Sequence, residues 1–440
     1  MTELEENKKI SRLKVAPKII SRSDHIISRM QISDSALKVL YRLKNAKYKA
    51  YLVGGAVRDI LLGIKPKDFD VVTDAEPEQI RELFRNCRLI GRRFRLAHIQ
   101  FGKEIIEVST FRASHHISDS NEGHEREGRI IRDNVYGDID DDVWRRDFTI
   151  NALFYNINDF SVVDYVGGIE DLELGQLRLI GDPKKRYVED PVRMLRAIRF
   201  ISKFDLNVHP LTENPIIQFS YLLETIPTAR LYEEMLKLFL NGFAFKTYIS
   251  LRKYDLFIYL FPQTEQVLTQ NKKGYPHEFI KNALKNTDQR VKHGKSVNPG
   301  FLLATILWAP MRIMIEEYSS NVHSDIEATK LAGDAIISKQ ISSISIPRRF
   351  THMARDIWTL QARLKQTKRK SYRVLMHPRF RAAYDLLLLR AQSGEPLNDL
   401  VEYWTKEQLQ EPQIGKSKIK TRQKRNNSNR NTKNSKKKDL

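Results

Sequence analysis

The sequence predicts an α+β fold, with a small mixed-sheet head followed by an all-helical neck, body and basic helical region. Between residues 50 and 165, short β-branched or alternating segments (AYLV, DFDVVT, EIIEVSTFR) are interleaved with helical ones (AVRDILLG, EPEQIRELFRN). From EDPVRMLRAIRF, which begins at Glu189, the pattern is almost wholly helical as far as residue 405. We therefore expect an arm, a head and four further regions. Their bounds are 1–33 (N-terminal arm), 34–165 (head), 166–230 (helical neck), 231–340 (helical body), 341–405 (basic helical region) and 406–440 (basic tail).

The elements follow from local signals. We expect the N-terminal arm to be extended or loosely docked. SDSALKVLYRLKNAK then predicts an amphipathic helix, and AVRDILLG a short one that Gly63 ends. The polar segment 114–130 predicts a mobile loop. Asp190 is a natural N-cap, and Pro191 a natural first-turn residue, for the helix that follows them.

The charge of the chain indicates a polyanionic partner. Its 75 Lys and Arg against 54 Asp and Glu give a net charge of +21, which favours nucleic acid over an anionic membrane surface. Eleven of the cations lie in the last 25 residues, from Lys416, together with one acid, Asp439. This tail has almost no apolar residues and is predicted to be disordered. It either grips phosphates nonspecifically or only keeps the protein soluble.

The composition also narrows the compartment. Cys87 is the only cysteine, which excludes an intramolecular disulfide and a cysteine-based zinc cluster and fits a reducing cytoplasm. No stretch approaches the roughly 18 apolar residues of an integral membrane segment. The first residues lack the apolar core of a secretory signal.

Two acids flank one aromatic residue in KPKDFDVVTDAEP. On a strand, Asp68 and Asp70 would project to one side while Phe69 anchors the other. Carboxylates held so close repel unless they share a proton or a cation, and paired carboxylates suit Mg²⁺. Two such ions about 4 Å apart could activate a hydroxyl and stabilise a leaving pyrophosphate. Taken alone, such a pair is more often a solvated turn.

The stretch VGGAVRD makes the metal site more specific. Gly54 and Gly55 stand between an apolar strand and a helix, where backbone N–H groups can approach a phosphate. Arg58, in the first turns of that helix, could reach the same anion. A tight turn is the alternative for a glycine pair alone.

These motifs together resemble those of the class II nucleotidyltransferases, the family of CCA-adding enzymes and bacterial poly(A) polymerases. LVGGAVRDILLG and KDFDVVTDA are followed in order by RRDFTINAL, DYVGGIEDL and EDPVRMLRAIRF. LIGRRFRLAHIQF, EIIEVSTFR, VNPGFLLATILWAP and HPRFRAAYDLLLLRA look like the poly(A) polymerase I branch. The resemblance covers roughly residues 20–400.

The resemblance implies roles for individual residues. Asp68 and Asp70 would hold two Mg²⁺ ions, or Mn²⁺, and Asp147 would be a third catalytic carboxylate. Without the resemblance, Asp147 could equally be a helix cap paired with a neighbouring arginine. The triphosphate of the substrate ATP would be held by Gly54, Gly55 and Arg58. Further candidates for its phosphates or ribose are Arg112 and Arg146.

The incoming base would be recognised by the EDxxR motif, here through Asp190 and Arg193, with Arg196 and Arg199 continuing the line. Carboxylate and guanidinium can pair with the amine and the ring acceptors of a base. Both ATP and CTP present such groups. The preference for ATP therefore rests on resemblance, chiefly at Arg92, Arg93 and Phe94. A capped helix with a solvated basic stripe is the alternative.

A second basic surface is expected in the segment 348–372. Its cations are Arg348, Arg349, Arg355, Arg363, Lys365, Lys368, Arg369 and Lys370. Trp358 and Tyr372 stand among them and would be available for stacking bases of an RNA 3′ end. A solvated helical face is the alternative.

The sequence is thus interpreted as a template-independent polynucleotide adenylyltransferase, which adds AMP from ATP to RNA 3′ ends and releases pyrophosphate. A CCA- or A-adding enzyme for tRNA is the alternative, and a non-catalytic RNA-binding protein is a rival of another class. There is no His-Asp doublet, so an HD-type phosphohydrolase domain is not expected. There is also no Walker A pattern, so ATP is expected as substrate rather than as P-loop fuel. We expect a monomer, with RNA-decay proteins as possible partners.

Overall fold

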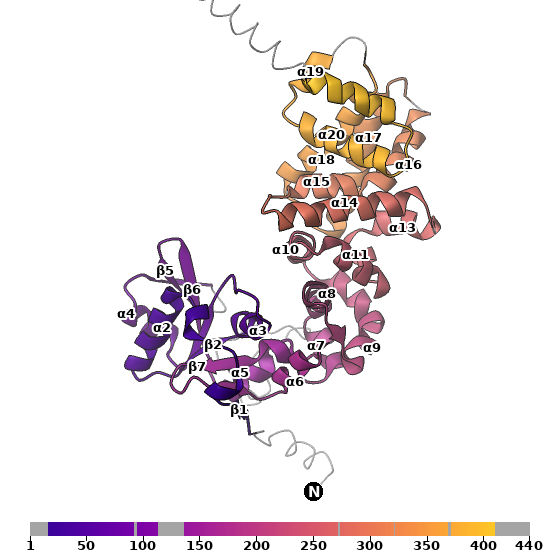
Figure 1. Ribbon diagram of the computed structural model, residues 1–440. Helices are drawn as coiled ribbons and strands as arrows, with labels where there is room; N and C mark the ends of the chain where they lie inside the picture. The colour runs from indigo at the N-terminus through magenta and orange to yellow at the C-terminus, as the bar shows by residue number, and fades with distance from the viewer. Residues whose placement is uncertain are drawn as a thin grey trace, which may run out of the picture. The chain divides into compact units, whose positions relative to one another are not determined.

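The structure is a computed structural model (Figure 1). It describes residues 16–91, 95–112, 136–271, 273–320, 322–367 and 371–409. The chain divides into two compact units between Leu223 and Glu224. The predictions for the loop 114–130, for Arg92, Arg93 and Phe94, for Lys368, Arg369 and Lys370, and for the tail lie outside the described residues.

The head is built on a mixed sheet, as predicted. In the described residues its strands are β1 Lys18–Ile20, β2 Ala50–Val53, β3 Asp70–Thr73, β4 Cys87–Ile90, β5 Leu96–Phe101, β6 Glu104–Thr110, β7 Leu153–Asn156 and β8 Val162–Asp164. Their order is β1-β8-β7-β2-β3-β6-β5-β4. Only β3 and β6 pair in parallel within this sheet; the other neighbours are antiparallel.

Alternating side chains give the sheet two apolar faces. Leu52 and Val71 lie in a core shared with the helices α2 Asp34–Asn45, α3 Gly55–Leu61 and α4 Pro77–Leu83. Val53 and Val72 lie in a second cluster together with Val143 of α5 Ile139–Arg145. The sheet is therefore covered on both faces.

The segment before α2 differs from the loosely docked arm that the sequence predicts. β1 pairs with β8 at the edge of the sheet, and the turns η1 Arg22–Asp24 and η2 Arg29–Gln31 follow. Ile27 and Ile32 are buried in the core. Burial of each of these side chains stabilises the fold by about 1.5–3 kcal/mol. Residues 18–33 therefore belong to the head.

The rest of the first unit connects the sheet to a helical neck. Its elements are η4 Thr149–Asn151, α6 Gly168–Glu173, β9 Gln176–Leu177, α7 Pro183–Glu189, α8 Val192–Phe204, β10 Asn207–Val208, α9 Pro210–Phe219 and η5 Ser220–Thr225. Asp190 ends α7, and α8 begins at Val192 with Pro191 as its N-cap residue, one residue later than predicted. The Oδ1 of Asp190 accepts from Val192 N at 3.3 Å.

The second unit is helical throughout its described residues, as predicted. Its helices are α10 Thr228–Phe239, α11 Ala244–Lys253, α12 Phe257–Leu260, α13 Pro262–Gln270, α14 Tyr275–Lys292, α15 Pro299–Ile306, α16 Trp308–Ser319, α17 Asp325–Ser343, α18 Arg348–Leu364, α19 Ser371–Leu375 and α20 Phe380–Gln392, with a last helix over 398–409.

Trp358 corrects one prediction. It is fully buried, and its Nε1 donates to the carbonyl oxygen of Ala304 at 3.0 Å. The ring therefore belongs to the core between α15 and α18 and cannot stack an RNA base. Arg348, Arg349 and Arg363 of the same helix remain exposed.

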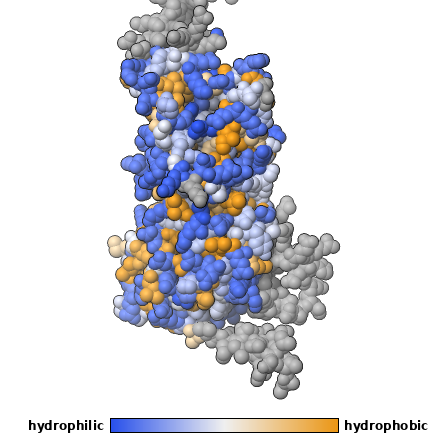
Figure 2. Space-filling view, turned by 90° about the vertical axis from the view of Figure 1, so that its right-hand side faces the viewer, coloured by the Kyte–Doolittle hydropathy of each residue, from blue (hydrophilic) through white to orange (hydrophobic). Residues whose placement is uncertain are grey.

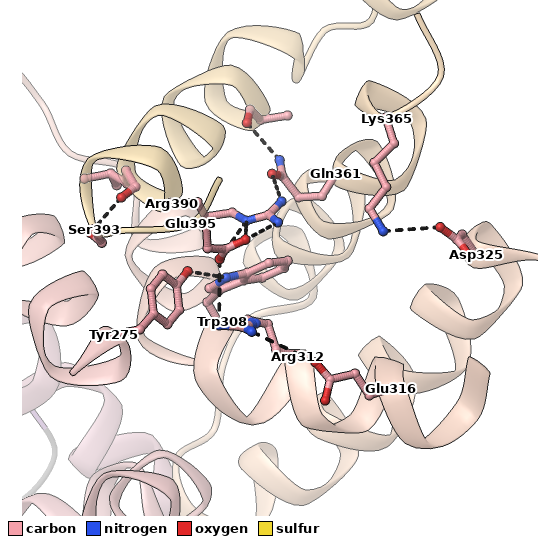
Figure 3. A network of polar contacts seen from close by, with 12 residues as sticks. Tyr275, Trp308, Arg312, Glu316, Asp325, Gln361, Lys365, Arg390, Ser393 and Glu395 are labelled. Carbon is pink, nitrogen blue, oxygen red and sulfur yellow. Dashed lines mark hydrogen bonds and ion pairs between the residues drawn. The ribbon is translucent and has the colours of Figure 1, made fainter. Parts of the chain in front are cut away.

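A buried polar network joins several of these helices (Figure 3). Arg390 of α20 donates from Nη2 to Glu395 at 2.6 Å and from Nη1 to Gln361 at 2.9 Å. Its guanidinium lies 4.7 Å from the ring centroid of Trp308, whose Nε1 donates to the Tyr275 hydroxyl at 3.1 Å. Such a fully paired charge fixes how α14, α16, α18 and α20 meet.

The surface is mixed. On the face in Figure 2, hydrophobic residues form separate patches among hydrophilic ones. In the described part of the chain, no single helix is long and apolar enough to cross a membrane. By length and composition, only α15 and α16 taken together pass that test, and they are bent by 60°.

Candidate active site

A row of side chains crosses the sheet and changes from apolar to polar at Asp70. The register pairs Phe154 with Val53, Val53 with Asp70, Asp70 with Glu107, and Glu107 with His98. Paired residues of neighbouring strands face the same side. Phe154 and Val53 are buried in the second apolar cluster, whereas Asp70 is exposed. The polar half of this row is the candidate active site.

The two predicted metal ligands flank a buried anchor. Phe69 is 7% exposed and packs in the main core, while Asp68 and Asp70 are both exposed. β3 begins only at Asp70, so Asp68 lies in the preceding loop. The alternation that the sequence predicts thus holds across the loop–strand junction, and Phe69 fixes the positions of both carboxylates.

The surroundings of Asp70 raise the pKa of its carboxyl group. The pKa of Asp70 is raised to about 6, mainly by burial and then by the negative charges of Glu107 and Asp68. Arg146 opposes this rise. The carboxylate is nevertheless open to solvent on one side. A group crowded by like charges but accessible from water is a suitable place for a cation.

Glu107 and His98 extend this site and were missed in the sequence. Glu107 Oε1 lies 3.4 Å from His98 Nε2. EIIEVSTFR indicates a strand but not its neighbour, and only the parallel pairing of β6 with β3 places Glu107 beside Asp70. An acid that falls on the exposed side of an alternating strand is the one local signal that could have indicated it.

The glycine turn lies next to the acids. Gly54 follows Val53, the register partner of Asp70, and has φ +71° and ψ −127°, a conformation that a side chain would strain. A Cβ there would lie 3.5 Å from Arg146 Nη1. No side chain caps α3, so the N–H groups of its first turn are not closed off by a capping residue. Gly54, Gly55 and Arg146 are thus brought together.

The Arg58 guanidinium is buried and paired within the protein, and its expected role at the triphosphate stays a prediction. The residue is 5% exposed; its Nε donates to Asp59 at 2.9 Å and its Nη1 to Asn151. Its guanidinium lies 4.4 Å from the ring centroid of Phe204. Burial lowers the pKa of Arg58, against the effect of Asp59. Arg58 therefore ties α3 to η4 and α8 rather than presenting its charge to solvent.

Asp147 also forms its hydrogen bonds within the protein. Its Oδ1 accepts from Phe148 N at 2.8 Å and Asn151 Nδ2 at 3.0 Å, and its Oδ2 from Arg196 Nε at 2.7 Å. Burial disfavours its charge, but Arg196 and these hydrogen bonds hold its pKa below the usual value. The described residues contain no group of three or more potential protein ligands arranged for one ion. The expectation that Asp147 is a third catalytic carboxylate stays a prediction.

The EDxxR motif forms a linked set at the start of α8. Glu189 accepts from Arg193 Nη1 at 2.9 Å and from Arg186 Nη1 at 2.8 Å. Arg186 also donates from Nη2 to the carbonyl oxygens of Arg145 and Arg146, at 3.0 and 2.6 Å. The motif is thus connected to the segment that carries Asp147, and Arg193 is held in place by Glu189.

Further cations gather along α8 around Phe200. Arg199 and Arg196 lie 5.2 and 5.9 Å from its ring centroid. One turn further, Lys203 lies 3.6 Å from Asp59 Oδ2 and 4.4 Å from the Phe204 centroid. Lys203, four residues after Arg199, continues the predicted line of arginines and was missed by sequence reasoning.

Arg112 lies in an isolated β-bridge to Tyr136 at the edge of the segment 113–135. It is half-buried and has interaction partners of its own. Its predicted role in binding the nucleotide stays a prediction.

The second glycine pair, in DYVGGIEDL, differs from the first. The carboxylate of Asp164 accepts from the backbone N of Val166, Gly168 and Ile169 at 2.9–3.0 Å. A Cβ on Gly168 would lie 2.4 Å from the Thr149 carbonyl oxygen. This turn is closed by its own side chain, and its glycine is required for packing.

The chain matches known families in three places. The Poly A polymerase head domain matches residues 50–178. The family described as probable RNA and SrmB-binding site of polymerase A matches 205–268, and the polymerase A arginine-rich C-terminus matches 321–439. Poly(A) polymerase I of Salmonella typhimurium is 49% identical over 401 residues, which are 90% of this chain and 86% of the relative. The chain belongs to the poly(A) polymerase I family.

More distant relatives share less of the chain. A CCA-adding enzyme of Lactobacillus helveticus is 38% identical, but over 46% of this chain and 49% of its own. The structure of a Thermotoga maritima CCA-adding enzyme complexed with tRNA covers 86% of this chain and 83% of its own, with a TM-score of 0.57 and 21% identity. This likeness confirms the predicted fold. The poly(A) polymerase head match contains Asp68, Asp70, Glu107 and Asp147.

The acids present fit a magnesium ion. Mg²⁺ is commonly bound through one or two carboxylates and completes its shell with water and substrate phosphates. Asp68 and Asp70 supply two exposed carboxylates, and the pKa of Asp70 is raised first by burial and then by the negative charges of Glu107 and Asp68. A larger cage of protein ligands is not needed for such an ion.

Proposed function

We propose that this chain, a polynucleotide adenylyltransferase of the poly(A) polymerase I family, transfers AMP from ATP to RNA 3′ ends at the edge formed by Asp68, Asp70 and Glu107. The observation that carries the assignment is the row through Asp70, which places exposed acids beside the uncapped start of α3. The reaction joins an RNA 3′-hydroxyl to the α-phosphate of ATP and releases pyrophosphate.

Asp68 and Asp70 would hold the metal, two Mg²⁺ ions in the arrangement that we favour, with Mn²⁺ as a substitute. When bound, the ions would lower the pKa of the attacking hydroxyl and stabilise negative charge on the leaving pyrophosphate. Glu107 adds a third carboxylate beside Asp70 and is half-exposed. It is available to accept a proton or to contact a metal-bound water.

Backbone and arginine groups near the acids suit the triphosphate. A Cβ on Gly54 would lie 3.5 Å from Arg146 Nη1, so the start of α3 and this guanidinium form a positive edge next to the carboxylates. The Gly54 N–H itself donates to the Leu153 carbonyl oxygen at 3.3 Å. Arg112 remains a further candidate for the nucleotide. Arg58 supports this edge from behind by fixing α3 against α8.

The base would be recognised on α8. Asp190 and Arg193 supply an acceptor and a donor of hydrogen bonds, and Glu189 fixes the orientation of Arg193. Arg196, held by Asp147, lies one turn further along the helix. We propose that Asp147 contributes by positioning Arg196 and that the enzyme acts in the cytoplasm.

A single assay tests this proposal. Purified protein is incubated with a labelled unstructured RNA, Mg²⁺ and one nucleoside triphosphate at a time. We expect long tails with ATP and at most short extension with CTP, GTP or UTP. Extension restricted to tRNA, by CCA or a single terminal A, would replace this function by the tRNA-specific one.

The matched variants are Asp70→Ala and Asp74→Ala. Asp74 lies just after β3, and its Oδ1 accepts from Lys49 N at 2.7 Å, so its loss tests an acid outside the site. We expect Asp70→Ala to abolish AMP transfer while RNA binding persists, and Asp74→Ala to retain transfer. Tailing by Asp70→Ala would show that the metal assignment is wrong.

A further inference from the structure

A face of the second unit carries cations that no family match includes. α11 and α14 pack side by side (Figure 1). The C-terminal half of α14 lies between the matches that end at residue 268 and begin at residue 321. We propose that the α14 lysine face, made of Lys285, Lys292 and Lys295, binds phosphates of the RNA substrate. This inference rests on the proposed function, since RNA is the polymer assigned there.

The lysines are spaced to follow a polyanion. Lys285 and Lys292 are seven residues apart, so they lie on the same side of α14 and their Cα atoms are about 10 Å apart. Lys295 follows in the exposed turn after the helix. All three side chains are exposed. They form a short line of positive charge rather than a single point.

In the described residues these charges form no ion pair, although Lys292 is close enough to Asp288 to lower the pKa of that carboxyl. Among the described residues, none of the three lysines has an acidic side chain within ion-pair distance. By contrast, Lys281 of the same helix contacts Glu278 at 2.9 Å. A surface whose cations form no ion pairs with acidic side chains attracts phosphates more strongly than one whose cations are paired.

Asp288, the one acidic residue between Lys285 and Lys295, caps the start of a neighbouring helix. Asp288 accepts from the backbone N of Ala244 and Phe245, at 2.5 and 3.0 Å, and so closes the start of α11. Its negative charge is thereby offset by the helix terminus. The sequence from Lys285 to Lys295 contains no other Asp or Glu, so the face keeps its positive charge.

An aromatic ring borders the line. Lys285 Nζ lies 5.2 Å from the ring centroid of Phe245, which is half-buried at the start of α11 beside the exposed Lys246. Cations combined with an aromatic face are the means by which proteins hold single-stranded nucleic acid without sequence preference. The chemistry of this face therefore suits RNA better than an acidic protein.

Helix stability alone does not account for the pattern. Lys292 in the last turn of α14 would be favoured by the helix dipole. Lys285 lies two turns earlier, where that effect has faded. Arg290 is not counted in the face, because its Nη2 donates to the Ser296 carbonyl oxygen at 3.3 Å.

The test measures RNA binding directly, without ATP. Fluorescence anisotropy with a labelled 20-nucleotide oligo(A) compares the full chain with Lys285→Ala/Lys292→Ala/Lys295→Ala over a range of salt concentrations. Each lost phosphate contact should lower the slope of log K against log salt by about 0.7, so the triple variant should lose about 2. We expect its RNA Kd to rise about tenfold at moderate salt, and the KM for RNA to rise with kcat unchanged.

Controls separate the possible failures. Lys281→Ala, on the same helix but with an acidic partner, should leave the slope unchanged, and thermal unfolding checks that each variant is folded. If the triple variant misfolds, Lys285→Gln/Lys292→Gln is measured in its place. A folded variant with the wild-type slope overturns the inference even if AMP transfer is normal. RNA binding that depends on this face without AMP transfer would instead overturn the proposed function alone.

Discussion

Arg196 of α8 donates from Nε to Asp147 Oδ2 at 2.7 Å, across 49 positions of the sequence. Asp147 is 9% exposed and the Arg196 side chain 32%. The contact joins the end of α5 to the helix that carries the EDxxR motif. It makes the placement of Arg196 depend on an acid for which the family resemblance implies the role of a third catalytic carboxylate.

Asp147→Asn should therefore act on stability as well as on activity. Removing the charge leaves Arg196 without its carboxylate in a partly desolvated place, and we expect a loss of about 2 kcal/mol in the free energy of unfolding. Urea denaturation measures this loss, with Asp68→Asn as control, because Asp68 is exposed. In a double-mutant cycle, Arg196→Gln should cost much less in the Asp147→Asn background. Additive costs would mean that the pair does not couple.

The raised pKa of Asp70 predicts proton–metal competition. Below about pH 6 the carboxylate is protonated and its proton must leave before a cation binds. The affinity for Mn²⁺, followed by its paramagnetic signal, should therefore fall as the pH drops below about 6 and level off above it. In Asp70→Asn the remaining affinity should not change over this range. A break near pH 4 in the wild type would contradict the assignment.

The same shift has a consequence for stability. An acid whose folded pKa exceeds its unfolded value destabilises the fold as pH rises from about 4 to above 6, because the unfolded chain releases the proton more readily. Asp70→Asn should thus stabilise the metal-free protein at pH 7.5 by about 1 kcal/mol, after discounting for solvent exposure. The gain should fall to about a third of that value at pH 4.5. Thermal unfolding in EDTA at the two pH values measures it.

Glu107 should control Asp70 through its charge. Glu107→Gln removes the largest like-charge contribution to the pKa of Asp70, so the pH midpoint for metal binding should move to lower pH. AMP transfer should fall as well if Glu107 takes part in the reaction. His98→Ala, which removes the contact at 3.4 Å, should raise the Mg²⁺ concentration needed for half-maximal activity, and His98→Gln should restore part of it. An unchanged midpoint in Glu107→Gln would show that the two acids do not interact.

The two glycine turns should respond differently to alanine. Gly168→Ala forces a Cβ to 2.4 Å from a backbone oxygen and should cost about 3 kcal/mol of stability. Gly55→Ala places its Cβ in ordinary contact with Arg58 Nη2, at 3.5 Å. It should leave stability nearly unchanged but raise the KM for ATP, because the methyl group narrows the approach to the start of α3. Chemical denaturation and steady-state kinetics on both variants distinguish these outcomes.

The spacing of residues in the sequence was enough to predict features that depend only on local structure, such as which side of a strand a side chain occupies or where a helix ends. The buried Phe69 between two exposed acids follows from alternation, and Gly63 ends α3 with φ +70° as its position predicts. The basic helix 348–364 was also found. Its Trp358 was misjudged because helical periodicity within a mixed basic and apolar segment does not say which face meets α15.

Sequence alone determined the α+β head, the helical second unit and the acid pair with its glycine turn, because each depends on residues within a few positions of one another. Only the tertiary structure decided that Glu107 stands beside Asp70, that Asp147 pairs with Arg196, that Arg58 is buried, and that residues 18–33 complete the sheet. Those contacts join segments 36 or more positions apart. They are set by strand order, register and helix packing, which short-range patterns do not encode.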